Sequence, residues 1–301
     1  KKISQNYALK FLQNNYKPYL ILNSNKDAEG LFTGYYQPYI LGSLVKTELY
    51  DVPIYGKPVG LKKVNIGGGA RSYRIVKGRK YIKIPDRETI SKGPVLSYAP
   101  ILAWVESKVE RFFLQVQGSG TVILQNKKKL LLGYDGQNGH EYFAIGKYLV
   151  DQGYIDRSNI SMQSIVKWLK KHPNDQAMVL NMNPSFVFFK ILKQDSPNGA
   201  QGLPLTPGYS LAVDKNAVPL GSLLWLSTNY PKLKNGKVVA GKEFNRLMVA
   251  QDTGGAIKGE IRGDIFFGAG KKAEFFAGHM QQKGSYWMLL PKSMSNFKQY
   301  F

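Results

Sequence analysis

Short apolar runs separated by glycine, proline and polar residues make up most of the chain. Runs of this kind predict β-strands joined by turns rather than a helical bundle. In the first half, alternation of apolar and polar positions predicts strands at 73–76, 80–84 and 112–117. Later runs predict strands at 183–189, 203–213, 223–226, 247–250, 265–267 and 286–290.

Helical spacing occurs in only a few places. Tyr7, Ala8, Phe11 and Leu12 follow it and predict an amphipathic first helix over 3–16. A brief helix start is predicted at 85–89, with Asp86 as its cap. Three more helices are predicted in the interval 140–182: one opening at Gly139-His140-Glu141 and ending at Gly153, one capped by Ser161 and ending before Pro173, and one from Asp175 to Leu180.

Composition agrees with a folded, strand-rich protein. The 301 residues are 43% hydrophobic, which excludes wholesale disorder. The 31 glycines and 15 prolines favour strands and turns over a helical bundle. The 42 Lys and Arg outnumber 20 Asp and Glu, giving a net charge of +22. Such a surface attracts polyanions, whether nucleic acid, acidic lipid head groups or an acidic cell-wall polymer. The longest basic run, Lys127-Lys128-Lys129, is interpreted as a solvated hairpin turn.

Several kinds of active site are disfavoured by residue type and spacing. The chain has no cysteine, which excludes disulfides and thiol chemistry. Its three histidines show no metal-ligand spacing, so neither a metal nor a cofactor is expected. The segment 117–120, QGSG, lacks both the phosphate-loop and the nucleophile-elbow patterns. It is interpreted as a tight turn between strands that permits close approach of a glycan.

Carboxylates at strand ends are the remaining candidates for chemistry. Asp252 follows the apolar run 247–250 and precedes Gly254-Gly255, where positive φ is expected. Asp264 precedes the run 265–267, and Asp214 ends another strand. Ordinary turn capping is the simplest interpretation of each. A carboxyl held protonated by an apolar setting can also act as a general acid, and acid-catalysed cleavage of a glycosidic bond needs little else.

Seven motifs, in order along nearly the whole chain, resemble the membrane-bound lytic transglycosylase A family of Gram-negative bacteria. They are FTGYYQP at 32–38, QVQGSG at 115–120, NGHEYFAIGKYL at 138–149, NPSFVFF at 183–189, SLAVD at 210–214, LMVAQDTGGAIKG at 247–259 and GDIFFG at 263–268. The last third resembles the three-aspartate domain, whose carboxylates fall on Asp214, Asp252 and Asp264.

This resemblance implies a mainly β fold in two parts separated by a large groove. Residues 1–40 and 184–301 are expected to form a double-psi β-barrel. Residues 41–183 are expected to form an inserted β-rich domain, with helices at about 140–182. The groove between them is expected to hold a glycan strand of peptidoglycan.

The resemblance also implies an activity and roles for particular residues. The expected reaction cleaves the β-1,4 bond between N-acetylmuramic acid and N-acetylglucosamine without water and leaves a 1,6-anhydro end. Asp264 is expected to be the single general acid and base, with Asp252 assisting it and Asp214 in a supporting structural role. Groove contacts are expected from the following residues: Thr33, Gly34, Gln117, Ser119 and Gly254.

Two departures from the family pattern limit what it implies. Gln37 stands where a smaller residue is expected before Pro38, and the lipid-carrying N-terminal cysteine is missing. Membrane attachment is therefore inferred from the resemblance alone. The full-length form is expected to be a monomeric lipoprotein on the periplasmic side of the outer membrane. Three alternatives stay open: a hydrolase of the same glycan, a non-catalytic wall-binding protein and a basic β-barrel that binds nucleic acid.

Overall fold

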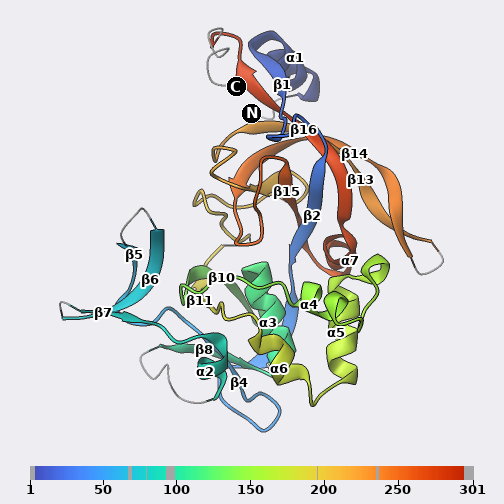
Figure 1. Cartoon of the computed structure of the whole chain (residues 1–301). Helices are drawn as coiled ribbons and strands as arrows, with labels where there is room; N and C mark the ends of the chain where they lie inside the picture. The colour runs from blue at the N-terminus through green and yellow to red at the C-terminus, as the bar shows by residue number, and fades with distance from the viewer. Residues whose placement is uncertain are drawn as a thin grey trace.

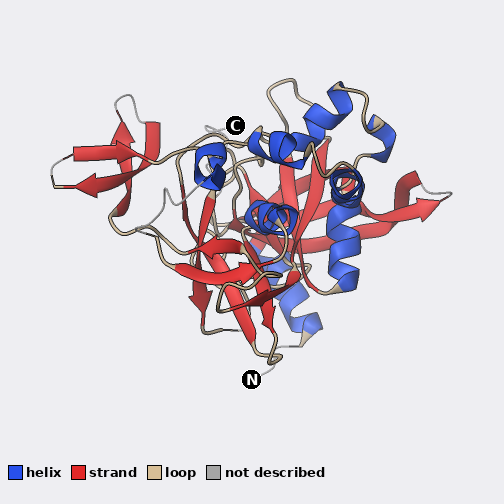
Figure 2. Ribbon diagram, turned by 90° about the horizontal axis from the view of Figure 1, so that it is seen from below, coloured by secondary structure: helices blue, strands red, loops and turns tan. Residues whose placement is uncertain are grey.

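The structure, a computed structural model, is mainly β, and its strands form three sheets (Figures 1 and 2). It describes residues 4–66, 70–78, 80–92, 99–194, 196–234 and 237–294. The mainly β fold class expected from the sequence is confirmed. Within the two larger sheets, strands that are far apart in the chain are hydrogen-bonded neighbours.

A closed barrel is formed by strands from the N-terminal part and the last third of the chain. Its strands are β2 (Gly30–Gln37), β12 (Ser210–Val213), β13 (Leu223–Lys234), β14 (Lys237–Asp252), β15 (Arg262–Ala269) and β16 (Gln281–Pro291). The order β16-β13-β14-β12-β15-β2 closes because β2 also pairs with β16. Parallel pairs, β12 with β14 and β15 with β2, occur beside antiparallel ones. This mixed six-stranded ring fits the double-psi barrel expected from the resemblance. A further strand, β1 (Tyr16–Leu20), extends the sheet at β16.

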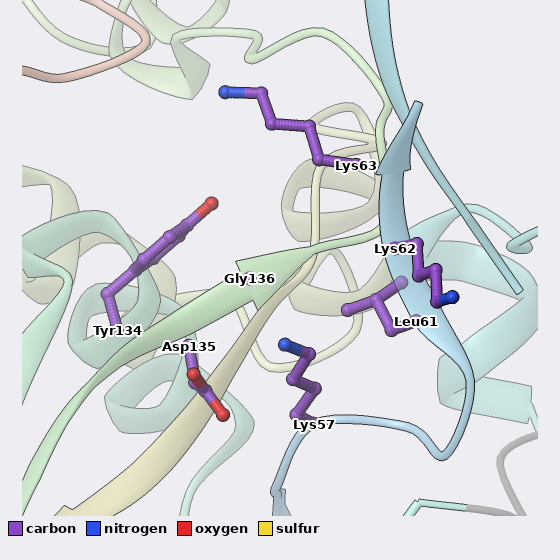
Figure 3. A pocket seen from close by; sticks show the side chains of 7 residues that line it. All are labelled: Lys57, Leu61, Lys62, Lys63, Tyr134, Asp135 and Gly136. Atoms are coloured by element: carbon purple, nitrogen blue, oxygen red, sulfur yellow. The ribbon is translucent and has the colours of Figure 1, made fainter. Parts of the chain in front are cut away.

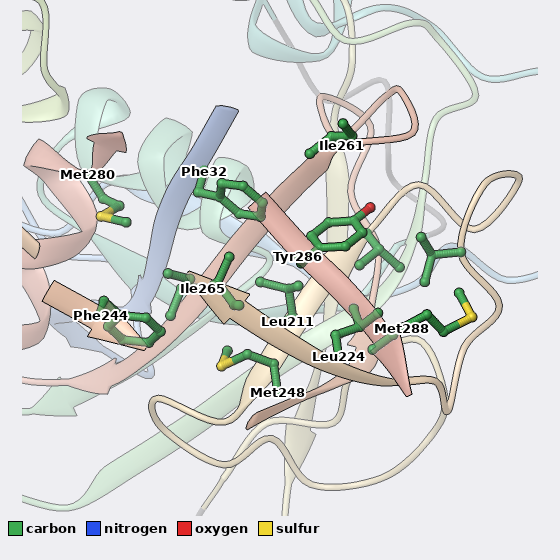
Figure 4. Packing of buried hydrophobic residues seen from close by; sticks show 14 residues of the cluster. Phe32, Leu211, Leu224, Phe244, Met248, Ile261, Ile265, Met280, Tyr286 and Met288 are labelled. Carbon is green, nitrogen blue, oxygen red and sulfur yellow. The ribbon is translucent and has the colours of Figure 1, made fainter. Parts of the chain in front are cut away.

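Apolar side chains from all six barrel strands fill the interior (Figure 4). Phe32, Ile265 and Tyr286 are fully buried there. Burial of a side chain of this size stabilises the fold by roughly 1.5–3 kcal/mol. Because side chains alternate along a strand, the neighbours of Phe32 and Ile265 point to the outside of the barrel.

A second sheet continues directly from the barrel. Its strands are β3 (Tyr39–Ser43), β4 (Val52–Tyr55), β8 (Ile101–Val105), β9 (Ser119–Leu124), β10 (Lys129–Gln137) and β11 (Val187–Leu192). Pro38 alone separates β2 from β3, so the chain changes sheets close to the expected residue 40. The last strand of this sheet is β11, which pairs with β10. The chain therefore passes back to the barrel sheet between residues 192 and 210. The domain boundaries at 40 and 184 stay predictions.

A small third sheet projects from the second as an arm (Figure 1). It consists of β5 (Leu61–Ile66), β6 (Ala70–Lys77) and β7 (Lys80–Lys83). Leu61 at the base of the arm is 4% exposed and packs with Phe186 and Phe188. The base is thereby fixed to the body of the protein.

Most helices lie on the second sheet or beside the barrel. The helices of the described residues are α1 (Gln5–Asn15), α2 (Arg87–Lys92), α3 (Lys108–Gln117), α4 (Ile145–Asp151), α5 (Met162–Lys171), α6 (Gln176–Asn181), α7 (Lys271–His279) and the 3-10 turn η1 (Arg157–Asn159). The predicted cap at Ser161 is confirmed, because it exchanges hydrogen bonds with Ser164 in a capping box. Asp86 likewise accepts from the backbone N–H of Thr89 at 2.9 Å. None of the helices in the described ranges is long and apolar enough to cross a membrane.

Several predictions of local structure were wrong, and the strand predicted at 203–213 is confined to β12. Residues 112–117 form the end of α3 instead of a strand; Ser107 caps this helix and Gly118 ends it with φ 75°. The segment 117–120 therefore joins a helix to β9 and does not join two strands. The helix predicted to open at Gly139 begins only at Ile145, because Asn138 holds the preceding loop through three backbone groups, Pro85 O, Pro184 O and Phe186 N.

Candidate active site

Strand register brings Thr33 and Asp264 together across 231 residues of sequence. In the parallel pair of β15 and β2, Asp264 lies directly opposite Thr33. Both follow the alternation that turns them away from the barrel interior. The hydroxyl of Thr33 donates a hydrogen bond of 2.6 Å to Oδ1 of Asp264. Asp264 is half-buried and is held by a neighbouring strand.

Arg262 extends this contact into a short chain of hydrogen bonds. Its Nη2 donates to Oγ1 of Thr33 at 2.8 Å, while its Nη1 donates to the carbonyls of Gly263 at 2.6 Å and Leu31 at 3.2 Å. Because Thr33 Oγ1 accepts from Arg262, its own hydrogen is committed to Asp264. Oδ2 of Asp264 makes no hydrogen bond to a described residue. The proton of a neutral Asp264 therefore belongs on Oδ2.

Electrostatics favour a carboxyl that changes protonation near neutral pH. Burial raises the pKa of Asp264 from its ordinary 3.8 to about 6, although the charge of Arg262 and the Thr33 hydrogen bond lower it. The charge of Asp252 raises the pKa of Asp264 further. A general acid is most effective when its pKa lies near the working pH.

A measurable consequence is that ionised Asp264 destabilises the fold. The pKa of Asp264 is higher in the folded protein than in the unfolded chain. Protonated Asp264 therefore adds its full contribution to the free energy of unfolding below about pH 4, and this contribution is lost as pH rises through about 6. We expect Asp264→Asn, which mimics the neutral acid, to unfold at higher urea at pH 7.5. The gain is up to about 2 kcal/mol after allowance for partial exposure. Urea unfolding at pH 4 and 7.5 checks this, and an equal difference at both pH values would contradict it.

Asp252 is fully occupied as an acceptor. Its Oδ2 accepts from the Tyr35 hydroxyl at 2.8 Å, and its Oδ1 accepts from the backbone N–H groups of Ala200 and Thr253, each at 2.9 Å. Burial raises its pKa, against the lowering effect of these bonds. Asp252 thus has its carboxylate fixed by neighbours, and it acts on Asp264 through its charge.

Asp214 directly follows the last residue of β12 and is held by backbone groups. It is 8% exposed and accepts from the backbone N–H groups of Asn216 at 3.1 Å and Gly259 at 3.0 Å. Burial raises its pKa, but these two hydrogen bonds bring the pKa below its ordinary value. The residue holds the loop between β14 and β15 against the end of β12.

Gln117 and Ser119 lie close to β2 but are engaged within the protein. Gln117 Oε1 accepts from the backbone N–H of Tyr36 at 2.8 Å, and its Nε2 lies 3.8 Å from the sulfur of Met162. Ser119 is 5% exposed, which leaves its side chain no open path to a glycan. Glycan contacts by these two residues remain predictions, and the contact by Ser119 requires a local rearrangement.

The two predicted glycine contacts have packing explanations. A Cβ at Gly34 would lie 2.5 Å from the Phe267 ring, so glycine is needed there for close packing. Gly254 and Gly255 do not have the positive φ expected from the sequence. Instead, a Cβ at Gly255 would lie 3.4 Å from Cβ of Tyr142, so this turn meets the loop before α4.

Arg262, Tyr35 and Tyr142 are site residues that the sequence patterns did not identify. Arg262 and Asp264 are two apart in one strand, as are Thr33 and Tyr35, so each pair shares a face. That spacing is a signal that could have found the first two. Burial raises the pKa of Tyr142, and the charge of Asp264 raises it further. Tyr142 comes from a loop, so no periodicity marks it.

Comparison with known proteins identifies the family of this chain. The model of the MltA specific insert domain matches residues 31–190, and that of the 3D domain matches residues 209–290. The chain belongs to the MltA family. Membrane-bound lytic murein transglycosylase A of Escherichia coli K12 is 35% identical over 260 residues, which are 86% of this chain and 65% of that protein. The chain thus spans about two thirds of the length of the curated relatives it matches.

Solved MltA structures share the fold. A membrane-bound lytic murein transglycosylase of Agrobacterium tumefaciens is 31% identical and superposes with a TM-score of 0.86, covering 100% of this chain and 83% of that one. E. coli MltA with bound chitohexaose is 32% identical with a TM-score of 0.76, covering 93% of this chain and 77% of that one. The strands that carry Thr33, Asp252 and Asp264 lie within the matched family regions.

Proposed function

We propose that this protein is a lytic transglycosylase that cleaves the β-1,4 bond between N-acetylmuramic acid and N-acetylglucosamine in peptidoglycan. The observation that carries the proposal is the state of Asp264: it is half-buried, its pKa is raised to about 6, and its Oδ2 is left without a hydrogen bond to a described residue. The curated relatives, which are named murein transglycosylases, support the substrate class.

In the first step, Asp264 acts as general acid. The proton on Oδ2 moves to the oxygen that bridges the two sugars, and the bond from that oxygen to C1 of the muramic acid breaks. The N-acetylglucosamine leaves with a free hydroxyl. Positive charge develops at C1 and its ring oxygen, as in other glycosidic cleavages. The ionised Asp264 now lies beside that charge.

In the second step, the same carboxylate acts as general base. Oδ2 takes the proton of the C6 hydroxyl of the muramic acid, and O6 forms a bond to C1 of its own ring. The product is a 1,6-anhydro sugar; Asp264 is protonated again and no water is consumed. Proximity within one sugar replaces the nucleophilic carboxylate that retaining glycosidases need.

The surrounding residues prepare Asp264 for both steps. Arg262 and Thr33 fix Oδ1 as an acceptor, so that Oδ2 presents the proton. Asp252 raises the pKa of Asp264 by its charge while its own oxygens remain bonded to Tyr35 and backbone N–H groups. Thr33 and Arg262 are therefore positioning residues in this proposal.

The substrate is an extended glycan lying between the barrel and the loop that carries Tyr142. The contact of Tyr142 with Gly255 and the effect of the Asp264 charge on its pKa support an aromatic residue on the side of the site that faces the acid. Aromatic side chains commonly pack against flat apolar faces of ligands. The solved structure of E. coli MltA with bound chitohexaose supports a glycan as the ligand of this site. The net charge of +22 suits an acidic wall polymer.

Product analysis tests this function against its nearest alternative. We expect mass spectrometry of purified peptidoglycan digested by the protein to show 1,6-anhydromuramic acid ends. Reducing ends alone would favour a hydrolase, and no cleavage would favour a non-catalytic wall-binding protein. The same digest with Asp264→Asn identifies products made by a contaminating enzyme.

We also propose that the full-length protein acts as a monomeric lipoprotein on the periplasmic side of the outer membrane. The relatives of E. coli and Vibrio cholerae named as membrane-bound support attachment to a membrane. Fractionation of cell envelopes expressing the full-length gene tests the location, and sedimentation equilibrium tests the monomer.

A further inference from the structure

A cavity of about 490 Å³ lies where the arm of β5–β7 leaves the second sheet (Figure 3). One wall is the end of β10, with Tyr134, Asp135 and Gly136, and the other is formed by Lys57 and the first residues of β5. Tyr134 is 43% exposed. The cavity therefore combines an accessible aromatic side chain with several ammonium groups.

Positive charge dominates the surroundings of this cavity. Lys57, Lys62 and Lys63 line it. Within the described part of the chain, Lys57 and Lys62 have no ion-pair or hydrogen-bond partner. Asp135 is the cavity's one lining carboxylate, and Lys190 lies 3.9 Å from it. The arm continues this charge, because residues 61–83 contain no Asp or Glu and eight basic residues: Lys62, Lys63, Arg71, Arg74, Lys77, Arg79, Lys80 and Lys83.

Both walls are held in place by the fold. Leu61 is buried in a core cluster, and the backbone N–H of Gly56 donates to the Pro100 carbonyl at 2.7 Å. Gly56 also forms a bridge with Phe189 in β11. The lysines therefore extend from a fixed base, which lowers the entropic cost of holding a ligand.

The cavity lies close in sequence to the candidate active site. β10 continues from Gly136 into the loop that carries Tyr142, whose pKa the charge of Asp264 raises. Tyr142 is six positions after Gly136, so their Cα atoms lie at most roughly 20 Å apart. A glycan bound at Asp264 can therefore present its substituents toward the cavity.

Resting on the proposed function, we propose that this cavity binds the carboxylate groups of the peptides attached to the peptidoglycan glycan. Lys57 points toward the cavity, Lys62 adds charge at its rim from the outer side of β5, Lys63 lies over its upper end, and the Tyr134 ring supplies an apolar wall (Figure 3). The site makes the protein distinguish peptide-bearing strands from bare ones. Carboxylate is the favoured anion because the peptides are covalently tied to the strand being cleaved.

The test compares two substrates, peptidoglycan strands with peptides and the same strands freed of peptide by an amidase. For Lys57→Gln/Lys62→Gln we expect KM on peptide-bearing strands to rise roughly three- to tenfold, as for the loss of two exposed ion pairs. KM on bare strands should stay unchanged. The matched control is Lys232→Gln/Lys234→Gln, which removes the same charge from the exposed β13–β14 hairpin on the opposite side of the molecule (Figures 1 and 2).

Each outcome decides for or against the site. An equal rise on both substrates, no rise at all, or the same rise in the control pair would each overturn it. Inhibition by inorganic phosphate at concentrations where glutarate has no effect would also overturn it, in favour of a phosphate ligand. If the wild type cleaves neither substrate, the proposed function fails instead. Titration calorimetry of the intact protein with a peptide-bearing disaccharide and its bare counterpart then still tests the site.

Discussion

Asp264→Asn reduces cleavage of peptidoglycan by about 10³-fold or more, because one residue serves as both acid and base and each such role is worth 10²–10⁴-fold. Asparagine keeps the size of the side chain and can still accept from Thr33. It has no proton of suitable acidity to give to the glycosidic oxygen. Glycan binding is expected to remain within about threefold of the wild type. Turnover is measured by release of soluble fragments, and binding by titration with chitohexaose.

The control for this change is Asp51→Asn, which neutralises an exposed aspartate elsewhere. We expect it to leave turnover and binding unchanged. Near-normal turnover in Asp264→Asn removes Asp264 from the mechanism. A loss of binding as large as the loss of turnover assigns the residue to substrate recognition instead of chemistry.

Thr33→Val gives the second largest effect and separates positioning from substrate contact. Loss of the hydroxyl removes a hydrogen bond that lowers the pKa of Asp264, so that pKa rises. The protonated form is required at the first step, and kcat/KM of the wild type therefore falls as pH rises through about 6. In Thr33→Val this falling limb moves to higher pH. We expect kcat to drop about tenfold with little change in KM, because Oδ1 is no longer fixed.

Two companion variants sharpen this prediction. Thr33→Ser keeps the hydroxyl and should restore both the pH profile and kcat. Arg262→Gln removes a charge that lowers the pKa of Asp264, so its falling limb should also move to higher pH. A rise in KM with an unmoved limb in Thr33→Val would show that Thr33 contacts the glycan, as first expected from the sequence.

Periodicity and turn residues predicted much of the local structure. Ser161 and Asp86 are caps because a small polar side chain before a helical pattern satisfies free backbone N–H groups. Asp214 and Asp252 were placed at strand ends because each follows a short apolar run. The error at 112–117 has the opposite origin: FFLQVQ also alternates, and the decisive signals were Ser107 before it and Gly118 after it.

The connections within the candidate site could not be read from the sequence. The bond from Thr33 to Asp264 spans 231 residues and depends on the register of β2 against β15. The same holds for Tyr35 and Asp252, 217 residues apart. Gln37, the residue that departed from the family pattern, is buried and donates to Thr121 at 2.6 Å, which joins β2 to β9. Local patterns carry no information about such partners.

The central claim is that Asp264 gives its proton to the bridging oxygen and recovers one from the same sugar, so that water never enters the reaction. Digestion of purified peptidoglycan in ¹⁸O-labelled water, followed by mass spectrometry of the new glycan ends, tests this most directly. The proposed mechanism predicts 1,6-anhydromuramic acid ends that carry no ¹⁸O. Reducing muramic acid ends carrying one ¹⁸O at C1 would contradict it.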